Sequence, residues 1–177
     1  MTLAKIQHAL QWDHRHLAQL MASPKIQPDR QDEVLHLTRI ARGLTLLMEG
    51  TTYDVATGVY LNPSDWKDRD LVAFLINDHV QIEQHEQLQH MRMWLHTRGL
   101  TKFGLDEVES FQPIGLSGKE HESMLYDVAS RLMAYGKNPK VGEHLSFGGE
   151  GQQVEVVRHR TDPLYGVPLA FREVRIT

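Results

Sequence analysis

The chain contains no cysteine, which excludes disulfide bonds, thiolate metal sites and cysteine nucleophiles. It also lacks an uninterrupted apolar run of the ~18 residues that a membrane-spanning helix requires. The first residues show no basic segment followed by an apolar one, as a secretory signal would. We therefore expect a cytoplasmic protein that does not contact a membrane.

The chain also lacks a strong excess of charge of either sign. The formal net charge is −4, and acidic and basic residues are interspersed along the chain without a basic run. A nucleic-acid-binding groove normally shows clustered lysine and arginine. The densest basic stretch, Arg158-His159-Arg160, is short and lies in a predicted strand, so we expect no nucleic-acid partner.

The N-terminal part of the chain carries two helical patterns. Apolar residues recur at spacings of three, four and seven over 2–22 and again over 29–49. Ser23-Pro24 separates the two helices, and Gly50 is suited to end the second. The sequence predicts a helical hairpin over residues 1–50, whose apolar stripes pack on the rest of the protein or on a partner.

Residues 51–177 contain a different pattern. We expect a buried strand over 55–61, a helix starting at Ser64 or Asp65 whose apolar face extends to Ile82, and a weaker strand over 105–111. Residues 91–97 alternate as a strand does, with Met93 and Leu95 facing one way and Trp94 and His96 the other. The alternative there is a continuation of the preceding helix to residue 97.

The C-terminal part predicts one more helix and a strand pair. Ser117 and Glu120 have the spacing of a capping box, and the helix that follows should end at Gly136. Residues 139–152 read as a glycine-rich loop, and 153–160 and 168–176 as two antiparallel strands. The order of elements indicates an α+β fold, in which helices pack on a mostly antiparallel sheet.

Several motifs of residues 55–177 resemble one bacterial family. They are "GVYLNPSDW" (58–66), "LHTRGLTKFGLDEVE" (95–109), "RLMAYGKNPKVGEHLSF" (131–147) and the final strand pair. In these the chain is similar to the uncharacterised bacterial domain of unknown function 4261. The resemblance implies an α+β fold and an accessory or immunity role beside bacterial secretion systems, and it implies no catalytic residue.

The segment "INDHVQIEQHEQLQH" (76–90) has the densest set of metal-ligating residues. On a helix, His79, Glu83, Glu86 and His90 have offsets of 0, 4, 7 and 11, and at about 100° per residue they lie within about 40° of one line. Such a stripe could bind zinc or another divalent metal. The opposing interpretation is a solvated polar face, because the spacing is not that of the H-E-x-x-H motif and four glutamines surround these side chains.

Other motifs favour no chemistry. A second cluster (His8, Asp13, His14 and His16) is interpreted as surface. The segment "FGGEGQQ" lacks the lysine of a phosphate-binding loop, and no nucleophile motif is present. We expect a non-enzymatic protein without a cofactor, which binds another protein or forms a homo-oligomer. The roles that fit this expectation are those of an immunity protein or an adaptor protein of a secretion system. The alternative is a metal-binding protein or metal-dependent hydrolase. Five aromatic residues are candidates for partner contacts or core anchoring: Trp12, Trp66, Trp94, Phe103 and Tyr165.

Overall fold

The computed structural model describes residues 30–147, 151–164 and 166–177. Its helices are α2 (Arg30–Met48), α3 (Pro63–Lys67) and α4 (Lys119–Tyr135). Its strands are β1 (Thr52–Asp54), β2 (Val59–Leu61), β3 (Gln81–Gln87), β4 (Arg92–Arg98), β5 (Glu107–Pro113), β6 (His144–Phe147), β7 (Gln152–Leu164) and β8 (Val167–Ile176). Three short 3-10 turns are η1 (Ile76–Asp78), η2 (Leu88–His90) and η3 (Leu100–Phe103).

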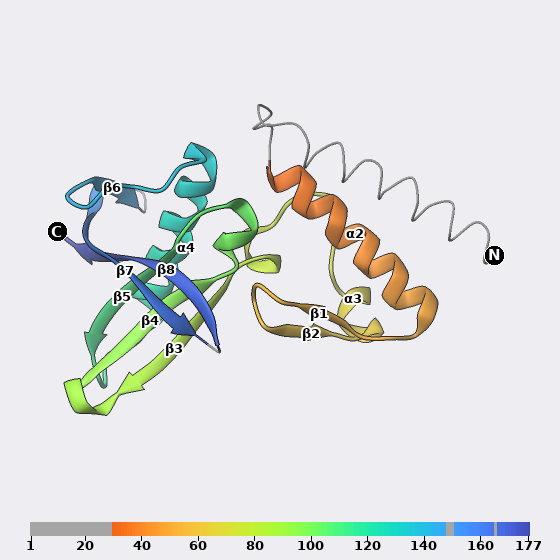
Figure 1. Cartoon of the computed structure of the whole chain (residues 1–177), viewed down its shortest axis with the longest axis horizontal. Coiled ribbons are helices and arrows are strands. Elements are labelled where there is room, and N and C mark those ends of the chain that lie inside the picture. Colours follow the sequence, from red (N-terminus) through yellow and green to blue (C-terminus); the bar gives the residue numbers. More distant parts are fainter. Residues whose placement is uncertain (1–29, 148–150, 165) are drawn as a thin grey trace.

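The main sheet has six strands in the order β3-β4-β5-β8-β7-β6. Its one parallel pair is β5 with β8, and the other neighbours run antiparallel. Helix α4 lies on one face of this sheet (Figure 1). The α+β prediction with a mostly antiparallel sheet is therefore confirmed.

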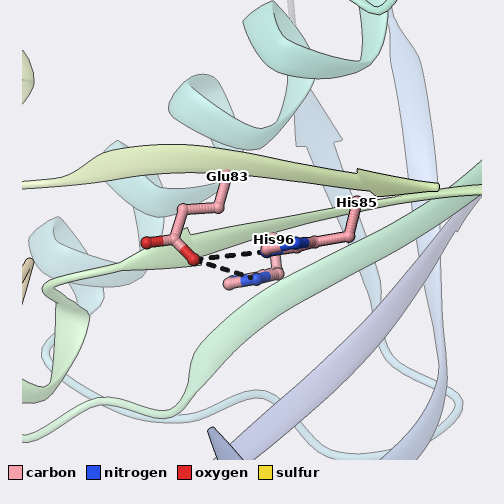
Figure 2. A group of neighbouring side chains, drawn as sticks. All are labelled: Glu83, His85 and His96. Carbon is pink, nitrogen blue, oxygen red and sulfur yellow. Dashed lines mark hydrogen bonds and ion pairs between the residues drawn. The ribbon is translucent and has the colours of Figure 1, made fainter. Parts of the chain in front are cut away.

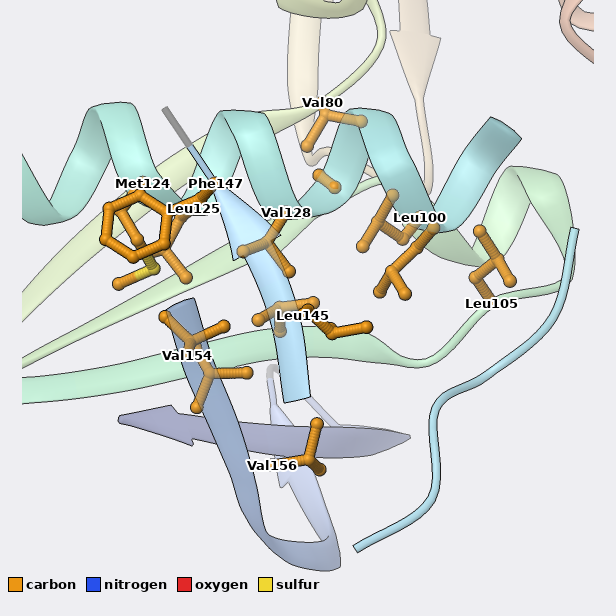
Figure 3. Packing of buried hydrophobic residues seen from close by; sticks show 14 of the residues in the cluster. Val80, Leu100, Leu105, Met124, Leu125, Val128, Leu145, Phe147, Val154 and Val156 are labelled. Carbon is orange, nitrogen blue, oxygen red and sulfur yellow. The ribbon is translucent and has the colours of Figure 1, made fainter. Parts of the chain in front are cut away.

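The core lies between α4 and the sheet. Leu125, Val128 and Leu132 of α4 are almost fully buried, and they belong to one cluster with Leu95 of β4 and Val108 of β5. Figure 3 shows Leu125 and Val128 within this cluster. Burial of each such side chain contributes about 1.5–3 kcal/mol to the free energy of unfolding. This packing fixes which side of each strand faces α4 and which side faces away.

A second, smaller cluster lies beside the sheet. Leu35 of α2, Leu61 of β2, Trp66 of α3 and Leu71 form it. Figure 1 shows α2, α3 and the β1–β2 hairpin beside the main sheet. Helix α2 confirms the predicted helix over 29–49 within one residue at each end. The predicted helix over 2–22 lies outside the described residues, so the hairpin and the boundary at residue 50 stay predictions.

The predicted buried strand over 55–61 is wrong for residues 55–58, and only Val59–Leu61 forms a strand, β2. Residues 55–58 form the turn of a small hairpin, and β1 pairs with β2 on its two sides. The Asp54 carboxylate accepts hydrogen bonds from the backbone N–H groups of Ala56 and Thr57, and Gly58 has φ of 75°. A short aspartate side chain and a glycine at positive φ are typical of a turn.

The long helix predicted from Ser64 or Asp65 to Ile82 is also wrong. Helix α3 has five residues and begins after Asn62, whose backbone N–H donates to the Asp65 carboxylate. The Arg39 guanidinium of α2 binds the carbonyl oxygens of Leu71 and Val72. These carbonyls therefore bond to α2 rather than to a helical turn of their own.

The remaining predictions differ in outcome. Strands β4, β5, β7 and β8 and helix α4 are confirmed, with strand ends shifted by a few residues. The predicted capping box is not formed, because Gly118 is the N-cap and no side chain caps the helix. The predicted loop over 139–152 contains strand β6, in which Leu145 and Phe147 alternate into the core.

None of the described helices combines the length and the apolar composition that a membrane span needs.

The turn between β4 and β5 is organised by one buried carboxylate. Glu107 accepts hydrogen bonds from the backbone N–H groups of Gly99, Leu100 and Thr101 at 2.9, 3.3 and 3.3 Å, and from the Thr97 hydroxyl at 2.7 Å. Gly99 has φ of 121°, and a Cβ there would lie 2.3 Å from the carbonyl oxygen of His79. This turn therefore requires both the glycine and the carboxylate.

We expect Glu107→Ala to lower the free energy of unfolding by about 3–5 kcal/mol, because it leaves several buried N–H groups without an acceptor. Urea denaturation followed by circular dichroism measures this change. Glu107→Gln keeps one acceptor oxygen and should cost less than half as much. An alanine variant as stable as the glutamine variant would contradict this role.

Candidate functional site

The face of the sheet away from α4 carries polar and aromatic side chains. Glu83 on β3 is paired with His96 on β4, and His85 is paired with Trp94. Residues paired across two strands have their side chains on the same face. Strand pairing thus brings together one carboxylate, two imidazoles and one indole. We call this face of the main sheet the open face.

Glu83, His85 and His96 form a compact group on the open face (Figure 2). The Glu83 Oε2 atom lies 3.3 Å from His85 Nε2 and 3.6 Å from His96 Nε2. The two imidazole rings stack with centroids 5.2 Å apart. All three potential ligand atoms lie within 4.8 Å of one another, and we call this group the histidine–glutamate cluster.

His96 is the buried member of the cluster, with no exposed surface. Its Nδ1 lies 3.0 Å from the carbonyl oxygen of Thr97 and donates to it. Its Nε2 is buried and has no hydrogen-bond partner. Burial lowers the pKa of His96 below its ordinary value, because the low-dielectric surroundings disfavour the charged imidazolium.

Arg98 holds the Glu83 carboxylate from the other side. Its Nη1 lies 3.1 Å from Glu83 Oε1, and its Nε donates to the carbonyl oxygen of Ala56 at 3.2 Å. A Cβ at Gly58 would lie 2.6 Å from the Arg98 Nη1 atom. The β1–β2 hairpin therefore positions this arginine, and through it the carboxylate.

A buried ion pair lies beside the cluster. Arg160 of β7 donates to both oxygens of Glu109 at 2.8 and 2.6 Å, and the Trp94 indole N–H donates to the same carboxylate at 2.8 Å. Arg160 also bonds to Asp162 and lies over the ring of Phe171. Every polar atom of this buried charge pair thus has partners, as burial requires.

A pocket of about 560 Å³ opens on the same face, next to Trp94. Three arginines line it, together with aromatic rings and the β3–β4 turn: Arg92, Arg158, Arg160, Trp94, Phe111, Glu86, Gln87, Leu88, Gln89, His90 and Asp162. The Arg92 guanidinium lies 3.8 Å from the centroid of Phe111 and donates from Nε to Gln87 Oε1 at 2.8 Å. We call this the arginine pocket.

The four residues of the predicted metal stripe are not brought together. Segment 81–87 is a strand, so Glu86 lies on the face opposite Glu83. His90 lies in η2 and is exposed, whereas His79 is buried and stacks on Phe74 at 4.6 Å. Within the residues that the structure describes, the one group of three close ligands shares only Glu83 with that stripe.

Sequence reasoning missed His85 and His96. Both could have been found from the pattern E-x-H in a strand, followed by a second strand with histidine on its polar side. The polar side of residues 91–97 was recognised from the sequence, but its partner segment was read as a helix. The register between the two strands is what joins the three side chains.

The aromatic candidates have separate roles. Trp66 and Phe103 are buried in the two hydrophobic clusters, and Trp94 lies on the open face. Trp12 and Tyr165 lie outside the described residues.

Residues 80–162 match the family model described as protein of unknown function (DUF4026), C-terminal. The matched span contains every residue of the histidine–glutamate cluster and of the arginine pocket. A domain of unknown function was expected from the motifs, but the family that matches is not family 4261. Searches of curated proteins and of solved structures found no match to this chain.

Arg160→Met should lower the free energy of unfolding by about 3–5 kcal/mol, because it leaves the Glu109 carboxylate buried without its counter-ion. Asp162→Asn removes the more exposed partner of the same guanidinium and should cost less than about 1 kcal/mol. Urea denaturation at constant ionic strength compares the two variants. Equal losses would mean that the buried pair is not the important contact.

Burial lowers the pKa of His79 to about 4, and the nearby Lys102 and Arg69 act in the same direction against the opposing Asp54. Below pH 6.5 the unfolded chain protonates this histidine, but the folded chain keeps it neutral until about pH 4. The free energy of unfolding should therefore decrease between pH 6.5 and 4, by on the order of 3 kcal/mol.

Urea denaturation of the wild type and of His79→Phe at several pH values between 7.5 and 4 measures this effect. Phenylalanine can keep the stacking on Phe74 but cannot take up a proton, so its variant should lose less stability on acidification. The same pH dependence in both proteins would assign the effect to other groups.

Proposed function

We propose that this chain is a non-enzymatic protein-binding domain, and that its arginine pocket receives an acidic side chain from an extended segment of a partner protein. The observation that carries the proposal is that the described contacts of the Arg92 guanidinium include no carboxylate. Its described contacts are an amide oxygen and an aromatic ring, and neither neutralises its charge. A carboxylate is the group that pairs best with a planar guanidinium, since it can accept two parallel hydrogen bonds.

The other two arginines differ from Arg92. Arg160 is neutralised by Glu109 and Asp162. Arg158 has a half-exposed side chain and lies 3.6 Å from Glu173. Arg92 is therefore the primary contact for an anion, and Arg158 supplies a second, weaker one.

The rim of the pocket favours a protein over a small anion. Leu88 and Met91 in the β3–β4 turn are 67% and 71% exposed, and Trp94 and Phe111 line the pocket beside them. Exposed apolar and aromatic side chains around arginine are typical of protein interfaces. A nucleic acid would require more unpaired positive charges than this pocket provides.

This proposal places the contact surface on the open face of the sheet. An accessory, adaptor or immunity protein of bacterial cytoplasm would have such a surface and would need no catalytic group. A homo-oligomer would also use it if an acidic segment of a second copy entered the pocket.

Selection of random peptides on the purified, full-length chain tests the proposal. We expect bound peptides that combine Asp or Glu with a neighbouring apolar residue. Arg92→Gln should weaken binding of a selected peptide by about 1.5–3 kcal/mol, or roughly ten- to a hundredfold in Kd. Isothermal titration calorimetry measures this change.

Lys137→Gln is the matched control, since it removes one positive charge from an exposed residue just beyond α4 and should leave Kd unchanged. Selected peptides without acidic residues, or equal weakening by both substitutions, would overturn the proposal. A chain that dimerises by light scattering and loses its dimer in Arg92→Gln would identify a second copy as the partner.

A further inference from the structure

We propose that Glu83, His85 and His96 form a binding site for one divalent transition-metal ion with the ligand preference of zinc. The site would use one carboxylate oxygen and two imidazole nitrogens, and would leave one position open to solvent. This inference is separate from the arginine pocket, because the two sites share none of these three side chains.

The distances within the cluster suit tetrahedral coordination. Two ligands about 2.1 Å from a zinc ion at the tetrahedral angle are about 3.4 Å apart. The Glu83 Oε2 atom lies 3.3 Å from His85 Nε2 and 3.6 Å from His96 Nε2. The two nitrogens are within 4.8 Å of each other, and His85 can close this separation because its side chain is 37% exposed.

The tautomer of His96 supplies an independent observation. The Nδ1–H group donates to the carbonyl oxygen of Thr97. The neutral ring therefore carries its proton on Nδ1 and a lone pair on Nε2. This nitrogen is buried, has no hydrogen-bond partner and faces Glu83 Oε2. Two acceptors that face each other repel, and a cation between them would turn this repulsion into binding.

The surroundings resemble those of a metal ligand set in one further respect. Metal-bound histidine usually donates its other N–H group to a carbonyl or carboxylate, and metal-bound carboxylates are themselves hydrogen-bonded. His96 has the first contact with Thr97, and Arg98 gives Glu83 the second by binding Oε1. The other oxygen, Oε2, faces the two imidazole nitrogens.

The donor set determines the class of metal. Two imidazoles and one carboxylate suit zinc, cobalt, nickel and copper, whereas magnesium and calcium prefer sites built from oxygen alone. The positive charge of Arg98 opposes any cation. That charge is balanced by the Glu83 carboxylate, which Arg98 binds directly.

The alternative is a purely structural cluster in which Glu83 accepts a hydrogen bond from His85. The two explanations differ in their response to zinc. A metal site binds zinc, whereas a purely structural cluster does not. Metal-free protein, prepared as the full, tag-free chain by dialysis against EDTA, is titrated with zinc chloride by isothermal titration calorimetry. Magnesium chloride is titrated in parallel.

We expect one zinc site per chain with a Kd in the micromolar range or tighter, no heat with magnesium, and a higher Tm with zinc. His85→Ala should weaken zinc binding at least tenfold, and it should leave the metal-free Tm almost unchanged because this residue lies on an edge strand. His90→Ala is the matched control, since it removes an exposed histidine from the same hairpin and should bind zinc as the wild type does.

Adventitious binding to the N-terminal histidines is separated by a variant with His8, His14 and His16 all changed to alanine, which should keep the site. Cobalt substitution adds a spectroscopic test, because four-coordinate Co²⁺ absorbs visible light much more strongly than the hydrated ion. The absence of zinc binding, or equal binding by the wild type and His85→Ala, would overturn the proposal. Neither result bears on the proposal that the arginine pocket binds an acidic segment.

Discussion

Helix α4 covers one face of the main sheet and leaves the other face to the sheet's own side chains. On the covered face, burial of apolar groups stabilises the fold without polar partners. On the open face, buried positions are occupied by charged and aromatic residues. A buried charge there needs a counter-ion or several hydrogen-bond donors, and Arg160 with Glu109 provides the central ion pair.

This pair connects strands that are distant in the sequence. Arg160 on β7 reaches Glu109 on β5 over the ring of Phe171, which belongs to the intervening strand β8. Trp94 on β4 donates to the same carboxylate and lies 4.2 Å from His96, ring to ring. The buried pair thus fixes Trp94, which separates the histidine–glutamate cluster from the arginine pocket and packs beside both.

Local sequence patterns were sufficient where burial is one-sided and regular. The apolar stripe of α4 and the alternation of β4 predict these elements because each has one face in the core. Segment 63–87 could not be predicted in this way, since its glutamines, glutamates and histidines fit a helix as well as an edge strand. Seven residue pairs with β4 and the contacts of Arg39 with Leu71 decide its conformation, and these contacts are not local.

The candidate site shows the same limit. Residues 76–90 were recognised as rich in ligands, but a helix joins positions four and seven apart, whereas a strand joins alternate residues and those of its neighbour. Glu83 and His85 lie on the edge strand, and His96 lies on the strand inside it. An ion bound by all three would therefore link the edge strand to the sheet through side chains as well as backbone. Occupancy of this site would stabilise the hairpin whose turn carries Leu88.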